Sequence, residues 1–465
     1  MSIIDTLKIK GREVFPLVEG GKGISATNGM SAGAWAHAGG IGTFSGVNAD
    51  FFDELGQTVH QIYKGITRQD RHKELIEFGI QGGITQAQIA HETSNGQGMI
   101  NMNILWEMGG AVPILHGILD KAKGLIHGVT CGAGMPYKLA EIAAQYEVLC
   151  YPIVSSARAF NALWKRAYHK FSDHIGAVVY EDPWLAGGHN GLSNAENPEE
   201  PQSPYERVLA LRNLLKEFGQ SMLPIIVAGG VWCLHEWKDW IDNEELGPIA
   251  FQFGTRPLLT QESPIPQSWK DKLLQIKKGD VFLNRFSPTG FYSSAVRNDF
   301  LMELIGRSER QMAYSEKADD IFNQPFTYGP RQRVLYLKPE DFQKASKYKT
   351  LGYAEIIKTP DDTIVFVTKE QSAQIHQDQV DCMGCLSACN FSNWSQHDGH
   401  TTGKKPDPRS FCIQKTLQDI AHNGDVDHNL MFAGHNAYRF GEDPFYQNGF
   451  IPTVKQLIDR ILTGY

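Results

Sequence analysis

The sequence has little cysteine and no long apolar run. Seven of its 465 residues are cysteines, and four of these crowd between positions 382 and 412. This uneven spacing excludes the disulfide framework of a small secreted protein. No apolar stretch approaches the ~20 residues that cross a bilayer, and the N-terminus lacks the charged and apolar regions of a signal peptide. We therefore expect a cytoplasmic protein with no membrane segment.

Two further absences narrow the class of protein. Lysine and arginine total 44 against 52 acidic residues, and no basic block stands out, so nothing favours nucleic-acid binding. No Gly-x-Gly-x-x-Gly motif follows the first predicted strand, which disfavours a Rossmann dinucleotide domain. With 42% hydrophobic and 21% charged residues the composition is that of an ordinary globular protein. A small-molecule substrate fits this composition, and whether the chain forms a homodimer stays open.

Short apolar segments alternate with helical patterns over the first 260 residues. Eight segments have the character of buried strands: 12–18, 40–46, 98–104, 125–128, 148–154, 177–180, 224–228 and 249–253. Helical patterns lie between most of them, at 25–38, 51–93, 111–123, 137–145, 157–171 and 204–218. This α/β alternation predicts a parallel sheet closed into a (β/α)₈ TIM barrel, with an open doubly wound sheet as the alternative.

The alternation stops near residue 260, which predicts two domains. Residues 1–260 would form the barrel, and 261–465 a C-terminal extension that contains a cysteine-rich segment at 382–412. Within the extension, the apolar runs 334–337 and 363–367 could pair as an added β element. The chain ends in a helical pattern at 454–462, which we expect to pack back on the barrel.

Glycines follow three consecutive predicted strands. They are Gly187-Gly188, Gly229-Gly230 and Gly254-Thr255, and their amides could converge on one phosphate at the barrel mouth. Simple turn chemistry is the alternative interpretation. His189 directly follows the first pair, and histidine is the side chain best suited to proton transfer near neutral pH. We therefore consider His189 the leading general base, against the alternative of an ordinary loop histidine.

Polar side chains near the strand ends could complete such a site. Asn103 and Gln252 could hydrogen-bond the edge of a flat heterocycle, although either could be an ordinary satisfied polar residue. Glu181 and Asp182 could orient His189 or bind ribityl hydroxyls.

The clustered cysteines form a second motif. Cys382-x-x-Cys385-x-x-x-Cys389, with Cys412 further along, supplies four thiols to one region, and closely spaced thiolates can enclose a soft metal centre. Structural zinc usually uses two paired motifs, and the second pair is missing. The spacing is closer to that of an iron–sulfur cluster such as [4Fe-4S], while zinc and free buried thiols remain alternatives.

These motifs resemble the nitronate monooxygenase family, also called 2-nitropropane dioxygenases, which are FMN-dependent TIM barrels. The most specific marks are Ala186-Gly187-Gly188-His189-x-Gly191, Ala228-Gly229-Gly230-Val231 and Gln252-x-Gly254-Thr255-Arg256. Weaker marks include Gly20-Gly21, Asn103 and Val154-Ser155-Ser156. The C-terminal part is similar to a longer branch of the family with clustered cysteines and an Asn436-Ala437-Tyr438-Arg439-like stretch.

The resemblance implies an FMN site and a role for His189. FMN phosphate would be held by Gly188, Gly229-Gly230 and Gly254-Thr255, and His189 would face the flavin. The implied cofactor site also includes Gly20, Gly21, Asn103, Ser155, Glu181, Gly187 and Gln252. Lys22 departs from the family, whose members commonly carry methionine there.

The resemblance also implies the reaction. It would be oxidation of a small, carbanion-like nitronate with O₂. The alternative is an NAD(P)H-dependent flavin reductase of the enoyl-reductase or quinone-reductase type, with electrons relayed through an iron–sulfur cluster bound by Cys382, Cys385, Cys389 and Cys412.

Overall fold

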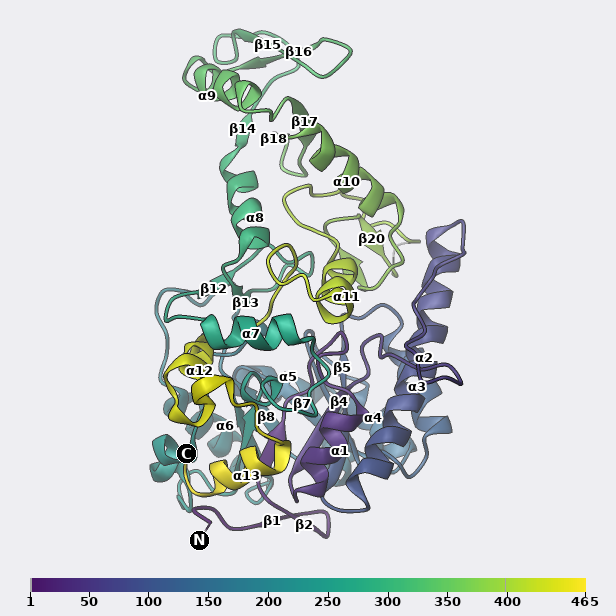
Figure 1. Ribbon diagram of the computed structural model, residues 1–465, viewed down its shortest axis with the longest axis vertical. Coiled ribbons are helices and arrows are strands. Elements are labelled where there is room, and N and C mark those ends of the chain that lie inside the picture. Colours follow the sequence, from purple (N-terminus) through teal and green to yellow (C-terminus); the bar gives the residue numbers. More distant parts are fainter. Residues whose placement is uncertain (1, 398) are drawn as a thin grey trace.

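Eight parallel strands close into a barrel, which lies in the lower half of the view in Figure 1. The computed structural model describes residues 2–397 and 399–465. Around the barrel the strands follow the order β10-β11-β3-β4-β5-β6-β7-β8. Their bounds are β3 Leu17–Glu19, β4 Ile41–Ser45, β5 Met99–Leu105, β6 Gly128–Gly132, β7 Leu149–Val154, β8 Val178–Glu181, β10 Ile225–Ala228 and β11 Ile249–Phe253. The predicted (β/α)₈ fold is confirmed, because each barrel strand overlaps one predicted segment.

Helices cover the outside of the barrel. They are α1 Gly29–His37, α2 Arg68–Ser94, α3 Ala111–Lys121, α4 Leu139–Gln145, α5 Ala157–Arg166 and α6 Pro204–Glu217, with short 3₁₀ turns η1 Tyr168–His174, η2 Leu234–Trp240 and η3 Arg256–Leu258. The long second helix begins later than the predicted 51–93, because Thr67 and Asp70 form a reciprocal capping box there. The predicted helix 157–171 likewise divides after Arg166.

The first predicted strand, 12–18, is two strands in different sheets. Pro16 separates β2 Arg12–Val14 from β3, and β2 pairs antiparallel with β1 Leu7–Ile9. Proline has no N–H to donate to a strand ladder, which explains the break. Ile9 and Val14 are buried with the residues that fill the barrel interior, so this hairpin closes the amino-terminal end of the barrel.

Part of the C-terminal extension packs directly on the barrel. Its elements are α7 Gln267–Gln275, β12 Val281–Asn284, β13 Ser293–Val296, α11 Ile413–Asn423, η4 His435–Tyr438, α12 Arg439–Glu442, η5 Pro444–Gly449 and α13 Val454–Leu462. Helix α13 contacts α1 and buries Val454, Leu457, Ile458 and Ile461 in the barrel's core. Each such side chain contributes about 1.5–3 kcal/mol when fully buried.

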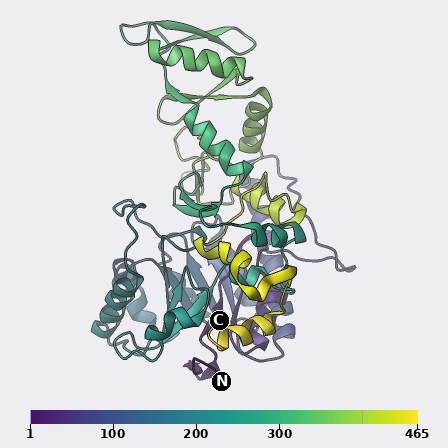
Figure 2. The same ribbon diagram turned by 60° about the vertical axis from the view of Figure 1, so that its left-hand side comes forward.

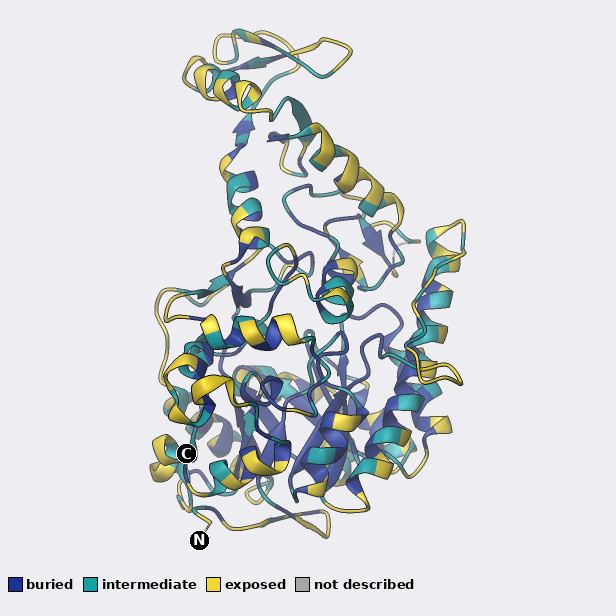
Figure 3. Cartoon of the chain, in the orientation of Figure 1, coloured by how far each residue is buried: buried dark blue, intermediate teal, exposed yellow. Residues whose placement is uncertain are grey.

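The remainder of the extension projects away from the barrel (Figures 1 and 2). It contains α8 Asp299–Glu309, β14 Gln311–Ala313, β15 Gln324–Tyr328, β16 Arg333–Leu337, α9 Pro339–Thr350, β17 Glu355–Lys358, β18 Thr363–Val367 and α10 Lys369–Val380. The segment with β19 Ala388–Cys389 and β20 Trp394–Ser395 returns to the barrel loops, where Ser387 N donates to the Glu107 carbonyl at 2.6 Å. We call residues 311–367 the arm. It has its own small apolar core, which includes Phe326, Leu337 and Phe366, and its outer surface is largely exposed (Figure 3).

The predicted pairing of 334–337 with 363–367 is wrong. β16 pairs with β15 in a hairpin, while β18 lies between β14 and β17 in a separate sheet. The missed partners are β15, β14 and β17, whose short half-exposed sequences lack a strong strand pattern. None of the helices in residues 2–397 and 399–465 combines the length and apolar character needed to span a membrane.

Candidate functional site

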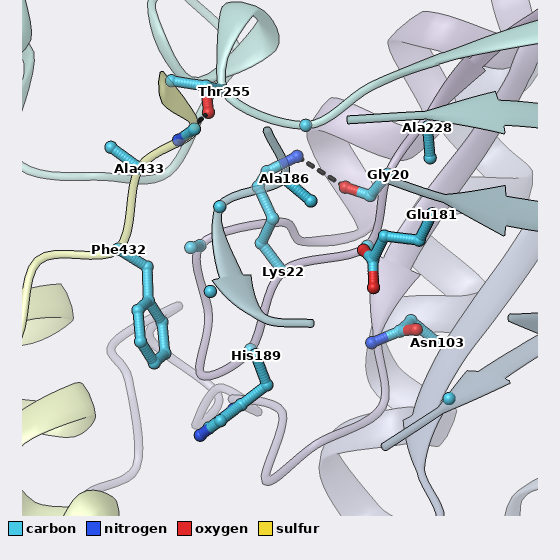
Figure 4. Close-up of a pocket in the computed structure, with 18 of the residues that line it drawn as sticks. Gly20, Lys22, Asn103, Glu181, Ala186, His189, Ala228, Thr255, Phe432 and Ala433 are labelled. Atoms are coloured by element: carbon cyan, nitrogen blue, oxygen red, sulfur yellow. Dashed lines mark hydrogen bonds between the residues drawn. The ribbon is translucent and has the colours of Figure 1, made fainter. Parts of the chain in front are cut away.

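A cavity opens at the carboxyl ends of the barrel strands, and most of the predicted site residues line it (Figure 4). Those on its wall are Gly20, Gly21, Asn103, Glu181, Gly187, Gly188, His189, Gly229, Gly230, Gln252, Gly254 and Thr255. They come from five different strand ends and from positions more than 200 residues apart in the sequence. The fold therefore gathers into one place what the sequence presents as separate motifs.

The register of the barrel strands places the polar side chains of the cavity at the same height along the barrel axis. Glu181 at the end of β8 is the partner of Ala228 on β10, which in turn is the partner of Gln252 on β11. On the other side of the barrel, Asn103 of β5 is the partner of Ser45 of β4. Equivalent positions on neighbouring parallel strands present their side chains at the same height, so Glu181 and Gln252 both reach the cavity.

The glycine loops are closely packed around this cavity. Gly188, Gly229 and Gly230 have φ angles of 73°, 89° and 78°, the left-handed region in which glycine alone is unstrained. At Gly187 a Cβ atom would lie 2.5 Å from the backbone of Ala433 and Gly434. The loops thus present bare backbone to the cavity, as a phosphate cradle requires.

His189 is held by the extension as well as by the barrel loop. It lies on β9 Gly188–His189, which pairs antiparallel with β13 of the extension. Its Nε2 is hydrogen-bonded to Ser287 Oγ at 2.6 Å, and Ser287 Oγ is 2.8 Å from Thr289 Oγ1. The His189 ring lies edge-on to Phe432 at 5.3 Å. Burial lowers the pKa of His189 to about 4, so the imidazole is neutral at pH 7.

The two carboxyls after β8 have different environments. Burial, and then the nearby Asp182, raise the pKa of Glu181 to about 8, so this carboxyl facing the cavity is protonated at pH 7. Asp182 accepts hydrogen bonds from the backbone N–H groups of Trp184 and Leu185, both at 2.9 Å. Asp182 therefore shapes the loop that leads to the glycines, and only Glu181 of the two lines the cavity.

The extension supplies a cover for the glycine loops that sequence reasoning missed. We call residues 432–437 the covering segment, and all of them except His435 lie on the cavity wall. Gly434 N donates to Thr255 Oγ1 at 2.9 Å, and Asn436 Nδ2 donates to the Gly230 carbonyl at 2.6 Å. In the sequence, the stretch that begins at Asn436 resembles the family, but this resemblance does not indicate a contact with the barrel.

Ser155 is not on the wall of this cavity. Its Oγ donates to the Gly191 carbonyl at 2.7 Å, and it lines a separate hollow beside the start of α5. The hydrogen bond fixes the loop that follows His189, so Ser155 acts on the site through the backbone.

The four clustered cysteines belong to one apolar cluster near the cavity. Cys385 lines the cavity, while Cys382 and Cys389 are buried with Phe391 and Trp394. Cys382 Sγ is 3.0 Å from Ser392 Oγ.

Burial determines the protonation state of these thiols. Burial raises the pKa of Cys389 to about 11 and that of Cys412 to about 12, so both thiols are protonated at pH 7. Across residues 2–397 and 399–465, no three histidine, cysteine or acidic side chains are arranged to hold a metal ion. Iron–sulfur or zinc binding by the four cysteines stays a prediction.

Solved structures of low sequence identity share the fold. FabK from Thermotoga maritima is 16% identical, with a TM-score of 0.51 over 97% of this chain and 92% of its own. Nitroalkane oxidase from Streptomyces ansochromogenes is 12% identical, with a TM-score of 0.51 over 97% and 95%. The enoyl reductase domain of MlnA from Bacillus amyloliquefaciens is 10% identical, with a TM-score of 0.50 over 97% and 94%.

The family assignment comes from the sequence. No curated protein matches this chain significantly. The family model described as nitronate monooxygenase, by contrast, matches residues 5–464, which include the barrel, the arm and the covering segment. The chain therefore belongs to the nitronate monooxygenase family and is a flavin-dependent oxidoreductase.

Proposed function

We propose that the protein binds FMN at the barrel mouth and oxidises a small nitronate with O₂. The observation that carries this proposal is the convergence of three glycine loops and His189 on one cavity at the carboxyl ends of the strands. Such loops bind phosphate in barrels of this kind through backbone amides. The left-handed backbone at Gly188, Gly229 and Gly230, which side chains rarely adopt, suits loops that present their amides to the FMN phosphate.

Each part of the site has a task in this reaction. Bound FMN would supply the electron-accepting ring and the reaction with oxygen. The amides of the glycine loops bind the phosphate, and the side chains of Asn103 and Gln252 orient the ring by its polar edge. The covering segment closes the cavity over the phosphate loops, which limits the access of water.

His189 handles protons in this scheme. Because its imidazole is neutral at pH 7, it can relay a proton to a reduced oxygen species, donating from one ring nitrogen while it accepts at the other. The hydrogen bonds through Ser287 to Thr289 give the imidazole a route by which that proton is replaced. Glu181, protonated at pH 7, can donate a hydrogen bond into the cavity without adding negative charge.

A second candidate is an NAD(P)H-dependent flavin reductase that reduces an unsaturated acceptor. The observation that favours it is the thiol of Cys385 on the same cavity wall, since oxidation by O₂ has no evident use for a redox-capable sulfur. An iron–sulfur centre on the four cysteines would favour this candidate further.

One preparation tests both candidates. We would purify the protein without air, record its visible spectrum, identify the released flavin by chromatography, and assay iron and zinc. Flavin bands with rapid oxygen uptake on propyl-2-nitronate support the first candidate. Steady NAD(P)H oxidation without nitronate, with stoichiometric iron, supports the second. A preparation without flavin contradicts both.

A further inference from the structure

The cavity has one cation that its surroundings leave available. Among the described residues on its wall, Lys22 and Arg256 carry the cationic side chains. Arg256 is 1% exposed; its guanidinium donates to the Trp232 carbonyl and to Tyr446 Oη, and lies 3.4 Å from Asp443. These contacts direct Arg256 into the extension. Lys22 is therefore the cation that an occupant of the cavity would meet.

Lys22 is fixed in position by short contacts (Figure 4). Its Nζ donates to the Gly20 carbonyl at 2.6 Å and lies 3.7 Å from Glu19 Oε1. Its backbone N–H donates to Thr27 Oγ1 at 2.8 Å, and its carbonyl accepts from Thr27 N at 3.1 Å. The side chain is 18% exposed, whereas that of Glu19 is 2% exposed. The ammonium thus sits between a buried carboxylate and the cavity.

Burying the Lys22–Glu19 ion pair costs desolvation free energy, which an anionic occupant of the cavity would offset. Removing Lys22 and Glu19 from water lowers the pKa of the lysine and raises that of the glutamate to about 7, while each charge favours the other. Apart from Arg256, the other ionisable groups described on the cavity wall are His189, Glu181 and Cys385, and burial keeps all three neutral at pH 7. Lys22 is therefore the positive charge available to stabilise negative charge that develops in the cavity.

The surroundings of Lys22 fit a resident ring better than a changing substrate. A Cβ atom at Gly20 would lie 3.1 Å from Gln252 Nε2, and one at Gly21 would lie 2.3 Å from Asn103 Cβ. The lysine loop is thus packed against the two amide side chains that suit the edge of a flat heterocycle. A cation pinned beside these amides is at the place where a flavin ring would be held.

We propose that Lys22, held by Gly20 and Glu19, stabilises the negative charge that the bound flavin ring acquires when it is reduced. This inference rests on the proposed FMN site. A ring that takes up two electrons and one proton gains one negative charge, and a fixed cation nearby favours that state electrostatically. Lys22 thereby raises the reduction potential relative to a member of the family with methionine at this position.

The test uses the flavin-loaded protein and two measurements. Lys22→Met removes the charge, Lys22→Arg keeps it, and Lys121→Met, at the exposed end of α3, is the matched control. We would measure the two-electron midpoint potential by dithionite titration, and the affinity for sulfite. Sulfite adds its sulfur lone pair to the oxidised ring and leaves the ring anionic. If Lys22→Met does not fold, Lys22→Gln replaces it as the neutral variant.

The expected result is specific to charge. Lys22→Met should weaken sulfite binding about tenfold. It should also lower the midpoint potential by about 30 mV, which corresponds to a tenfold change in equilibrium constant for a two-electron couple. Lys22→Arg and Lys121→Met stay within about threefold of the natural protein. The proposal is overturned if the potential of Lys22→Met is unchanged, even where sulfite affinity falls, or if Lys22→Arg changes as much as Lys22→Met. Absence of flavin from the natural protein refutes the FMN site itself instead.

Discussion

The covering segment and the arm belong to the same C-terminal extension, yet their surroundings differ. The covering segment donates hydrogen bonds to Thr255 and Gly230 and forms part of the cavity wall. The arm has a separate core, and none of its described residues lines the cavity. Membership of the extension therefore says little about a residue's role. What distinguishes the two regions is contact with the barrel loops, which the covering segment makes at the cavity.

The largest effect should come from the residue held jointly by barrel and extension. His189→Ala removes the proton-handling group while leaving the strand pairing of β9 with β13 intact. General acid–base catalysis contributes about 10²–10⁴-fold, so we expect turnover to fall by that factor with flavin still bound. Steady-state kinetics beside a flavin spectrum would measure it. A fall below about threefold would mean that His189 does not carry protons.

A matched pair of core truncations compares the two regions directly. Leu457→Ala in α13 and Leu337→Ala in the arm each remove a fully buried leucine, at a cost of about 2–5 kcal/mol. Leu457→Ala should lower the unfolding midpoint of the barrel and release flavin. Leu337→Ala should loosen the arm alone, with flavin content unchanged. Thermal melts followed by flavin fluorescence and by circular dichroism would separate them. Flavin loss in Leu337→Ala would contradict the division drawn above.

The raised pKa of Glu181 predicts a pH dependence of stability. With a folded pKa of about 8 and an ordinary unfolded value, the folded state binds more protons over the interval between them. The stabilisation is complete below the unfolded pKa and is lost as pH rises toward 8. Melting temperatures of natural protein should therefore fall more steeply than those of Glu181→Gln between pH 5 and 8.5. Parallel curves would show that Glu181 does not titrate in this way.

The smallest effect concerns one hydrogen bond of the covering segment. Asn436→Ala removes the donor to the Gly230 carbonyl and should weaken FMN binding by about 1 kcal/mol, roughly fivefold. Asn323→Ala, at an exposed position in the arm, is the control and should leave binding unchanged. Fluorescence titration of the flavin-free protein measures both. Equal affinities for the two variants would remove the covering segment from the cofactor site.

The barrel could be predicted from the sequence because its signals are local. Runs such as Ile225–Ala228 are continuous and apolar, as buried parallel strands require, and the glycines follow them within a few residues. The extension lacks such signals. The partner of β9 is β13, about a hundred positions later, and the contact between Gly434 and Thr255 spans 179 positions. Contacts of this kind leave no periodicity in the sequence, so the cover over the site could not be predicted.

The dependence of β9 on β13, and of the glycine loops on residues 432–437, has a consequence for synthesis. A ribosome that has translated the last of the eight barrel strands has completed little more than half of the chain. The glycine loops at the barrel mouth are by then complete, but their cover and the helix that docks against α1 have not been made. We therefore expect full retention of the flavin to await the last tenth of the polypeptide, and a chain terminated early to carry an open site.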